Sequence, residues 1–122
     1  MRIYQLKDFA IWATKEKIGH SALSKAVDEL ERGLIDAILL AGLYKKRIAR
    51  QGQGKRDGYR TILAYRQGDM VIFLYGFAKN EKANISQKDK EALKKLTEQY
   101  LTMSNTQLLQ AININELVEV TK

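Results

Sequence analysis

Two apolar segments separated by a short polar turn constrain the fold of this chain most. The segments YRTILAY (59–65) and MVIFLYGF (70–77) are rich in β-branched and aromatic residues, which favour strands. Between them, Gln67-Gly68 can form a two-residue hairpin loop. The sequence therefore predicts an antiparallel hairpin at the centre of a sheet.

The loop also sets which residues of the hairpin face each other. In this register Arg60 lies opposite Tyr75, and Ile62 lies opposite Phe73. Because side chains alternate between the two faces of a strand, one end of one face is expected to mix cations with aromatics. That end would hold Arg60, Tyr75, Phe77 and Lys79. The rest of the same face would be core, formed by Ile62, Ala64, Val71 and Phe73.

The distribution of charge points to the same part of the chain. The net charge is +7, and residues 43–82 hold ten Lys/Arg against three Asp/Glu, whereas the remaining segments are balanced. An excess confined to one segment is typical of a surface that binds a polyanion such as nucleic acid, with cations on phosphates and aromatics on bases. Two alternatives stay open: a merely solvated basic face, and Tyr75 and Phe77 as ordinary core aromatics.

The remaining segments predict a mixture of helices and strands. The N-terminal half predicts a strand at 2–6, helices at 8–17 and from an N-cap at Ser21 to Gly33, and a strand at 43–50 before the glycine-rich loop 51–58. Ser86 and Ser104 are expected N-caps of two further helices, and 116–120 is a possible closing strand. The lysines of the first of these helices alternate with acids and are expected on a solvated face: Lys88, Lys90, Lys94 and Lys95. The expected fold is α+β, in one domain over 1–122.

Composition excludes several kinds of site. The chain has no cysteine, so it has no disulfide, no thiolate nucleophile and no cysteine-based metal site. No segment resembles a signal peptide or is apolar for long enough to span a bilayer. We therefore expect a soluble, cytoplasmic protein without a membrane partner.

Several motifs together resemble the RelE/ParE superfamily of bacterial toxins, within its HigB-like branch. They are GLYKKRIARQGQGKRDGYRTILAY, FLYGFAKNEKANI and a following helix of the ALKKL kind, with likeness extending over nearly the whole chain. The resemblance implies a small RelE-like fold with a twisted antiparallel sheet, two N-terminal helices on one face and C-terminal helices. It also implies a ribosome-dependent mRNA endoribonuclease that needs no metal or other cofactor and is neutralised by an antitoxin, expected to be of the helix-turn-helix type.

Site residues follow from the resemblance by position. The expected catalytic residues are Lys45, Arg47, Arg60 and Lys79. The expected RNA-binding residues are Lys46, Arg50, Lys55, Arg56, Tyr75, Phe77 and Lys82. Alternation along 43–50 separates Lys45 and Arg47 from Lys46, which shares its side with Ile48, and this favours Lys45 or Arg47 for the active face.

Two other residues have side chains that could serve as catalytic groups. His20 is the only histidine, and it lies at an expected turn between helices, away from the basic strands. Tyr100 is the one candidate for the C-terminal tyrosine or acid found in several superfamily ribonucleases, but the helical pattern places it in the core. Besides the ribonuclease, two functions stay open: a gyrase-inhibiting toxin of the ParE type, and a non-catalytic RNA-binding remnant neutralised by an antitoxin.

Overall fold

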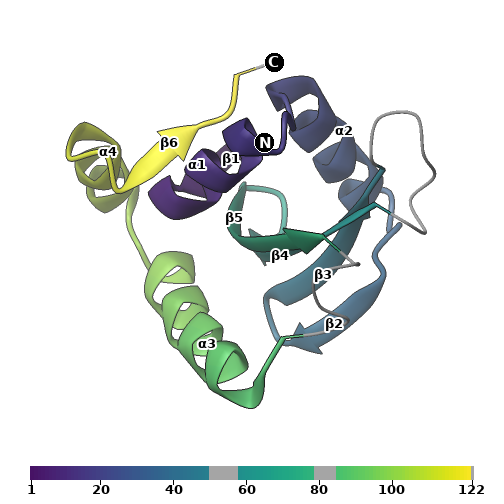
Figure 1. Ribbon diagram of the computed structural model, residues 1–122. Coiled ribbons are helices and arrows are strands. Elements are labelled where there is room, and N and C mark those ends of the chain that lie inside the picture. The colour runs from purple at the N-terminus through teal and green to yellow at the C-terminus, as the bar shows by residue number, and fades with distance from the viewer. Residues whose placement is uncertain (50–57, 79–84, 122) are drawn as a thin grey trace.

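The computed structural model describes residues 1–49, 58–78 and 85–121. Six strands and four helices lie within these ranges (Figure 1). In chain order they are β1 (Arg2–Leu6), α1 (Lys7–Lys15), α2 (His20–Glu31), β2 (Ala37–Leu40), β3 (Leu43–Ile48), β4 (Tyr59–Arg66), β5 (Met70–Ala78), α3 (Gln87–Leu101), α4 (Asn105–Asn113) and β6 (Leu117–Glu119). No helix in the described ranges is both long and apolar enough to cross a bilayer.

The strands form one sheet in the order β2-β3-β4-β5-β1-β6. β1 lies between β5 and β6 and runs parallel to β5, whereas every other neighbouring pair is antiparallel. The N-terminal strand at 2–6 and the α+β class are confirmed. The expected antiparallel sheet is in fact mixed, because the first strand of the chain inserts beside the last strand of the central hairpin.

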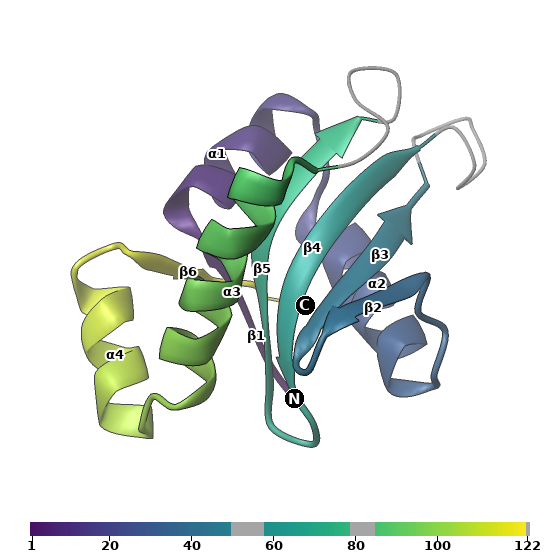
Figure 2. The ribbon, with the colours of Figure 1, turned by 90° about the horizontal axis from the view of Figure 1, so that it is seen from below.

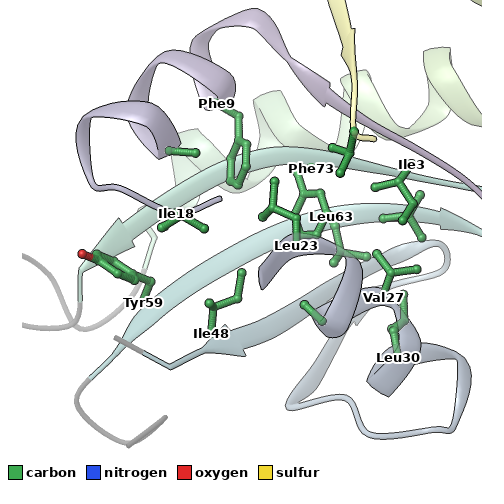
Figure 3. Packing of buried hydrophobic residues seen from close by; sticks show 14 of the residues in the cluster. Ile3, Phe9, Ile18, Leu23, Val27, Leu30, Ile48, Tyr59, Leu63 and Phe73 are labelled. Atoms are coloured by element: carbon green, nitrogen blue, oxygen red, sulfur yellow. The ribbon is translucent and has the colours of Figure 1, made fainter. Parts of the chain in front are cut away.

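Helices α1 and α2 cover one face of the sheet and bury the larger hydrophobic cluster. Figure 3 shows Phe9 and Leu23 facing Phe73 of the sheet, and the Phe9 and Phe73 rings stack with their centroids 5.2 Å apart. Trp12 lies directly over Gly76, where even a methyl group would overlap its ring. Helix α1 thus approaches β5 so closely that only glycine fits at this position.

Helices α3 and α4 pack on the opposite face of the sheet. Figure 1 shows the sheet between α3 and the pair of helices α1 and α2. The end of α3 is fixed to the sheet by Arg66 at the end of β4. Its Nη1 donates hydrogen bonds to the carbonyl oxygens of Leu101 and Met103, at 3.0 Å each, and its Nε donates to Asp69 at 2.6 Å. Arg66, one of the ten cations in residues 43–82, therefore has a structural role, because it donates hydrogen bonds to carbonyl groups at a helix end.

The turn of the β4–β5 hairpin is longer than predicted. Arg66 pairs with Met70, so the loop has three residues instead of two. Within it, the backbone N–H of Asp69 donates to the carbonyl of Arg66, and Gly68 has a φ of +76°. A glycine at this position makes the longer turn free of steric strain.

A β-bulge shifts the hairpin register a second time. Leu63 pairs with Phe73 but Ile62 pairs with Tyr75, so Leu74 is an extra residue on β5. Leu74 joins the cluster under α3 and α4, whereas Phe73 and Leu63 join the cluster under α1 and α2. The predicted core face, which grouped Ile62 with Phe73, is therefore wrong.

The two shifts have a joint consequence at the open end of the hairpin. The predicted pairing of Arg60 with Tyr75 is wrong, because Arg60 faces Phe77. Each shift alone would move β5 side chains to the other face, so the two together restore the expected face. Arg60, Tyr75 and Phe77 do share one face of the sheet.

Other differences are local. Strand β2 was not predicted. Helix α2 begins at His20, with Gly19 rather than Ser21 as its N-cap. Gly33 follows that helix with a φ of +85°, as expected of a residue just past a helix end. The caps of the C-terminal helices are confirmed: Ser86 accepts from the N–H of Asp89, and Ser104 forms a full capping box.

Candidate nucleic-acid interface

Three cationic side chains share one face of neighbouring strands. Arg47 of β3 faces Arg60 of β4, and Arg60 in turn faces Phe77 of β5. Lys45 lies on the same side as Arg47 and is the diagonal neighbour of Arg60, a relation that places Cβ atoms about 7–8 Å apart. Tyr75 completes the group from β5. We call Lys45, Arg47, Arg60 and Tyr75 the basic face; all four side chains are half-buried.

Arg47 is oriented by an acid that precedes β2. Its Nε lies 2.7 Å from Oδ1 of Asp36, and its backbone N–H donates to Oδ2 at 2.7 Å. Partial burial alone would raise the pKa of the Asp36 carboxyl, but the two hydrogen bonds and the charge of Arg47 outweigh burial and hold that pKa below its ordinary value. Asp36 is therefore ionised at neutral pH and fixes the guanidinium at the edge of the basic face.

Arg60 occupies the centre of the basic face. It lies between another arginine and an aromatic residue, and two like charges directly across a strand pair destabilise a sheet. Phe77 is only 2% exposed, and its ring lies 5.9 Å from that of Tyr75. Because Phe77 is buried, it is placed to support Arg60 and Tyr75 and not to stack on a base.

Lys46 points to the other face of the sheet. It is 3% exposed, and its Nζ lies 2.8 Å from Oε1 of Glu29 on α2. The neighbouring Thr61 donates from Oγ1 to the Lys46 carbonyl at 2.8 Å. The separation of Lys46 from Lys45 and Arg47 by alternation is confirmed. The expectation that Lys46 contacts RNA conflicts with this burial, so Lys46 is left out of the basic face.

Five of the expected site residues lie outside the described residues: Arg50, Lys55, Arg56, Lys79 and Lys82. The last paired residues of β3, β4 and β5 lie side by side at the open end of the hairpin. Ile48 faces Tyr59, and Tyr59 faces Ala78, the residue before Lys79.

The two other catalytic candidates lie elsewhere. His20 is the first residue of α2, and its Nδ1 accepts a hydrogen bond from the backbone N–H of Thr121 at 3.0 Å. Tyr100 is 1% exposed, and its hydroxyl donates to a carboxylate oxygen of Glu116. Burial, and then this hydrogen bond, raise the pKa of Tyr100 well above its ordinary value. Its expected place in the core is confirmed.

Asp36 is a site residue that the sequence reading missed. The apolar run AILL and the Gly42 turn that follows it were the available signals for a further hairpin strand, and with that strand Asp36 comes to lie beside Arg47. Gly42 has a φ of +82°, as a tight turn requires.

The basic face can bind phosphate and stabilise charge. Arginine holds two phosphate oxygens at once, and lysine is a compact charge that can transfer a proton. Within the described ranges, no group of three or more His, Asp or Glu side chains is arranged to hold a metal ion.

Comparison with known protein families places the chain beside a toxin family. A family model described as "RelE toxin of RelE / RelB toxin-antitoxin system" matches residues 1–120. The curated proteins contain no match to the chain.

Proposed function

The chain belongs to the RelE toxin family of toxin–antitoxin systems, and from this premise we propose that it is an endoribonuclease that cleaves mRNA on the ribosome. We further propose that it belongs to the HigB-like branch, acts in the cytoplasm and is neutralised by an antitoxin of the helix-turn-helix type. The observation that carries the ribonuclease proposal is the meeting of Lys45, Arg47 and Arg60 on one face of adjacent strands.

The proposed reaction is attack of a ribose 2′-hydroxyl on the neighbouring phosphorus. The O2′–P bond forms and the P–O5′ bond breaks, giving a 2′,3′-cyclic phosphate and a 5′-hydroxyl. A proton must leave O2′, charge builds up on the phosphorane oxygens, and a proton must reach O5′. The reaction needs no redox change and no cofactor. Positioned cationic side chains can therefore supply the groups that it requires.

Each residue of the basic face has a proposed role. Arg60, at its centre, stabilises the phosphorane through its two-pronged guanidinium. Arg47, oriented by Asp36, holds the adjacent phosphate. Lys45 is the proposed proton carrier: its amine accepts the proton that leaves O2′ and returns it to O5′, since lysine is the residue of the three that can exchange a proton. Lys79 is proposed as a further charge stabiliser, and this proposal rests only on its place in the sequence motif GFAK.

Primer extension on cellular messages after induction tests this function. The expected result is a set of discrete, codon-phased ends with the wild-type protein and none with Lys45→Arg, which keeps the charge but cannot transfer a proton at neutral pH. Growth arrest without message ends would contradict the proposal and favour a gyrase-inhibiting toxin. Wild-type ends from Lys45→Arg would remove Lys45 from proton transfer.

Tyr100→Phe separates core packing from catalysis. Loss of the hydrogen bond to Glu116 is expected to lower the free energy of unfolding by about 1–2 kcal/mol at neutral pH, with message cleavage unchanged. Because the pKa of Tyr100 is raised in the fold, this stabilisation is full below the ordinary tyrosine pKa of about 10 and is lost as pH rises through the folded value. Denaturant unfolding and cleavage measured on the same sample check both parts. Loss of cleavage at unchanged stability would make Tyr100 a catalytic residue.

A further inference from the structure

The four lysines of α3 do not share one side of the helix. Thr97 is buried against the sheet, and Leu101 packs over Gly42 at the β2–β3 turn. At 100° per residue, Lys90 and Lys94 lie within about 60° of Thr97, on the side of Leu101. Lys88 and Lys95 lie about 160–180° round the helix and face away from the sheet. The single solvated face expected from the sequence is therefore two different surfaces.

Lys90 and Lys94 lie at the same position along the strand direction as the cations of the basic face. Counted from Leu101, Lys94 and Lys90 lie about 10 and 16 Å along the helix axis. Counted from Gly42, which Leu101 covers, Lys45 and Arg47 lie about 10 and 16 Å along β3. Figure 2 shows α3 beside β5 with its axis running along the strands. Lys90 and Lys94 thus flank the open end of the sheet at the height of the strand cations.

The two lysine pairs also differ in their charge surroundings. Lys88 and Lys95 lie one helical turn on either side of Glu91, which offsets their charge. Lys90 and Lys94 are four residues apart, a spacing at which like charges destabilise a helix. Lys94 also lies one turn from Glu91 and from Glu98, whereas Lys90 has no acid three or four residues away. In the described part of the chain neither forms an ion pair, and Lys90 is half-buried. An anion beside α3 would relieve this repulsion.

We infer that Lys90 and Lys94 form a second bank of the phosphate-binding surface, across from Lys45, Arg47 and Arg60, and that a single RNA strand binds between the two banks. This rests on the proposed function, because it takes RNA as the ligand. The strand cations act at the cleaved phosphate, whereas Lys90 and Lys94 each contact a neighbouring phosphate and supply affinity and register. Lys88 and Lys95 take no part.

Two double variants of the full chain test the inference. Both remove two positive charges from α3, but from different sides of the helix. Lys90→Gln with Lys94→Gln is compared with Lys88→Gln with Lys95→Gln. The probe is a fluorescent single strand of 2′-O-methyl RNA, which lacks the attacking hydroxyl and cannot be cleaved. Its affinity is measured over a range of salt. Removing two phosphate contacts should make the log–log salt slope about 1.4 shallower and lower the affinity on the order of tenfold at physiological salt. The outward pair should behave as wild type, and thermal unfolding of both should match wild type.

The outcomes separate this inference from the ribonuclease proposal. Equal salt slopes for the two double variants, in a protein that cleaves messages in cells, would overturn the second bank and leave the ribonuclease standing. A shallower slope confined to the Lys90/Lys94 variant, in a protein that makes no message ends, would support the phosphate-binding surface and overturn the nuclease. A Lys90/Lys94 variant that melts well below wild type would show a structural role instead.

Discussion

Arg60→Ala is expected to lower mRNA cleavage by on the order of 10²- to 10³-fold, the usual effect of removing one positioned charge stabiliser. Arg60 is the central cation of the basic face, between Arg47 on β3 and Phe77 on β5. Its loss also relieves the repulsion between the facing arginines. We therefore expect the free energy of unfolding to change by no more than about 1 kcal/mol. Toxicity should disappear although soluble protein still accumulates.

Arg32→Ala is the matched control. Arg32 follows the last residue of α2 and is exposed, so its replacement removes the same charge without touching the basic face. Cleavage ends, thermal unfolding and antitoxin binding should be measured on both variants. Wild-type cleavage by folded Arg60→Ala would remove Arg60 from the mechanism. A fall in melting temperature that accounts for the lost activity would mean that Arg60 is an ion-pair partner in the fold.

The central hairpin shows how far sequence patterns carry the fold. Strand positions were predictable because β-branched and aromatic runs are long there. The pairing was not, because one extra turn residue and one extra residue at Leu74 each shift the register. Neither leaves a signal in a uniformly apolar strand. Arg60, Tyr75 and Phe77 still share one face as predicted, because two shifts of one residue return side chains to the face they would occupy without either.

Charge patterns alone did not separate surface cations from structural ones. Of the described cations in residues 43–82, Arg66 binds carbonyl groups at the end of α3, and Lys46 is paired under α2. Alternation did place Lys46 opposite Lys45 and Arg47, since the period of a strand is fixed. Its buried partner lies on a distant helix, and no local pattern indicates such a pairing. For the same reason, the contact between Asp36 and Arg47 could not be predicted from the sequence.

Lys46→Met is expected to be among the most destabilising single changes in the chain. The Lys46 and Glu29 side chains are 3% and 11% exposed, and their charged atoms lie 2.8 Å apart. Removing the lysine takes the cation away from a buried carboxylate, a change that typically costs about 3–5 kcal/mol. Set against a total stability of about 5–15 kcal/mol, this loss should lower the melting temperature by roughly 10–20 °C. Thermal and denaturant unfolding of the purified protein measure it.

The double variant Lys46→Met with Glu29→Leu decides what the pair is for. Replacing both members of a buried ion pair by apolar residues of similar size is often neutral or stabilising, so the double variant should regain most of the stability that Lys46→Met loses. If Lys46 only joins α2 to the sheet, the double variant should also cleave messages at the wild-type rate, since the basic face on the other side of β3 is unchanged. A stable double variant that has lost cleavage, or a Lys46→Met protein that melts as wild type but no longer binds RNA, would return Lys46 to the RNA-binding set. The strand alternation that separates it from Lys45 would then have to change when RNA binds.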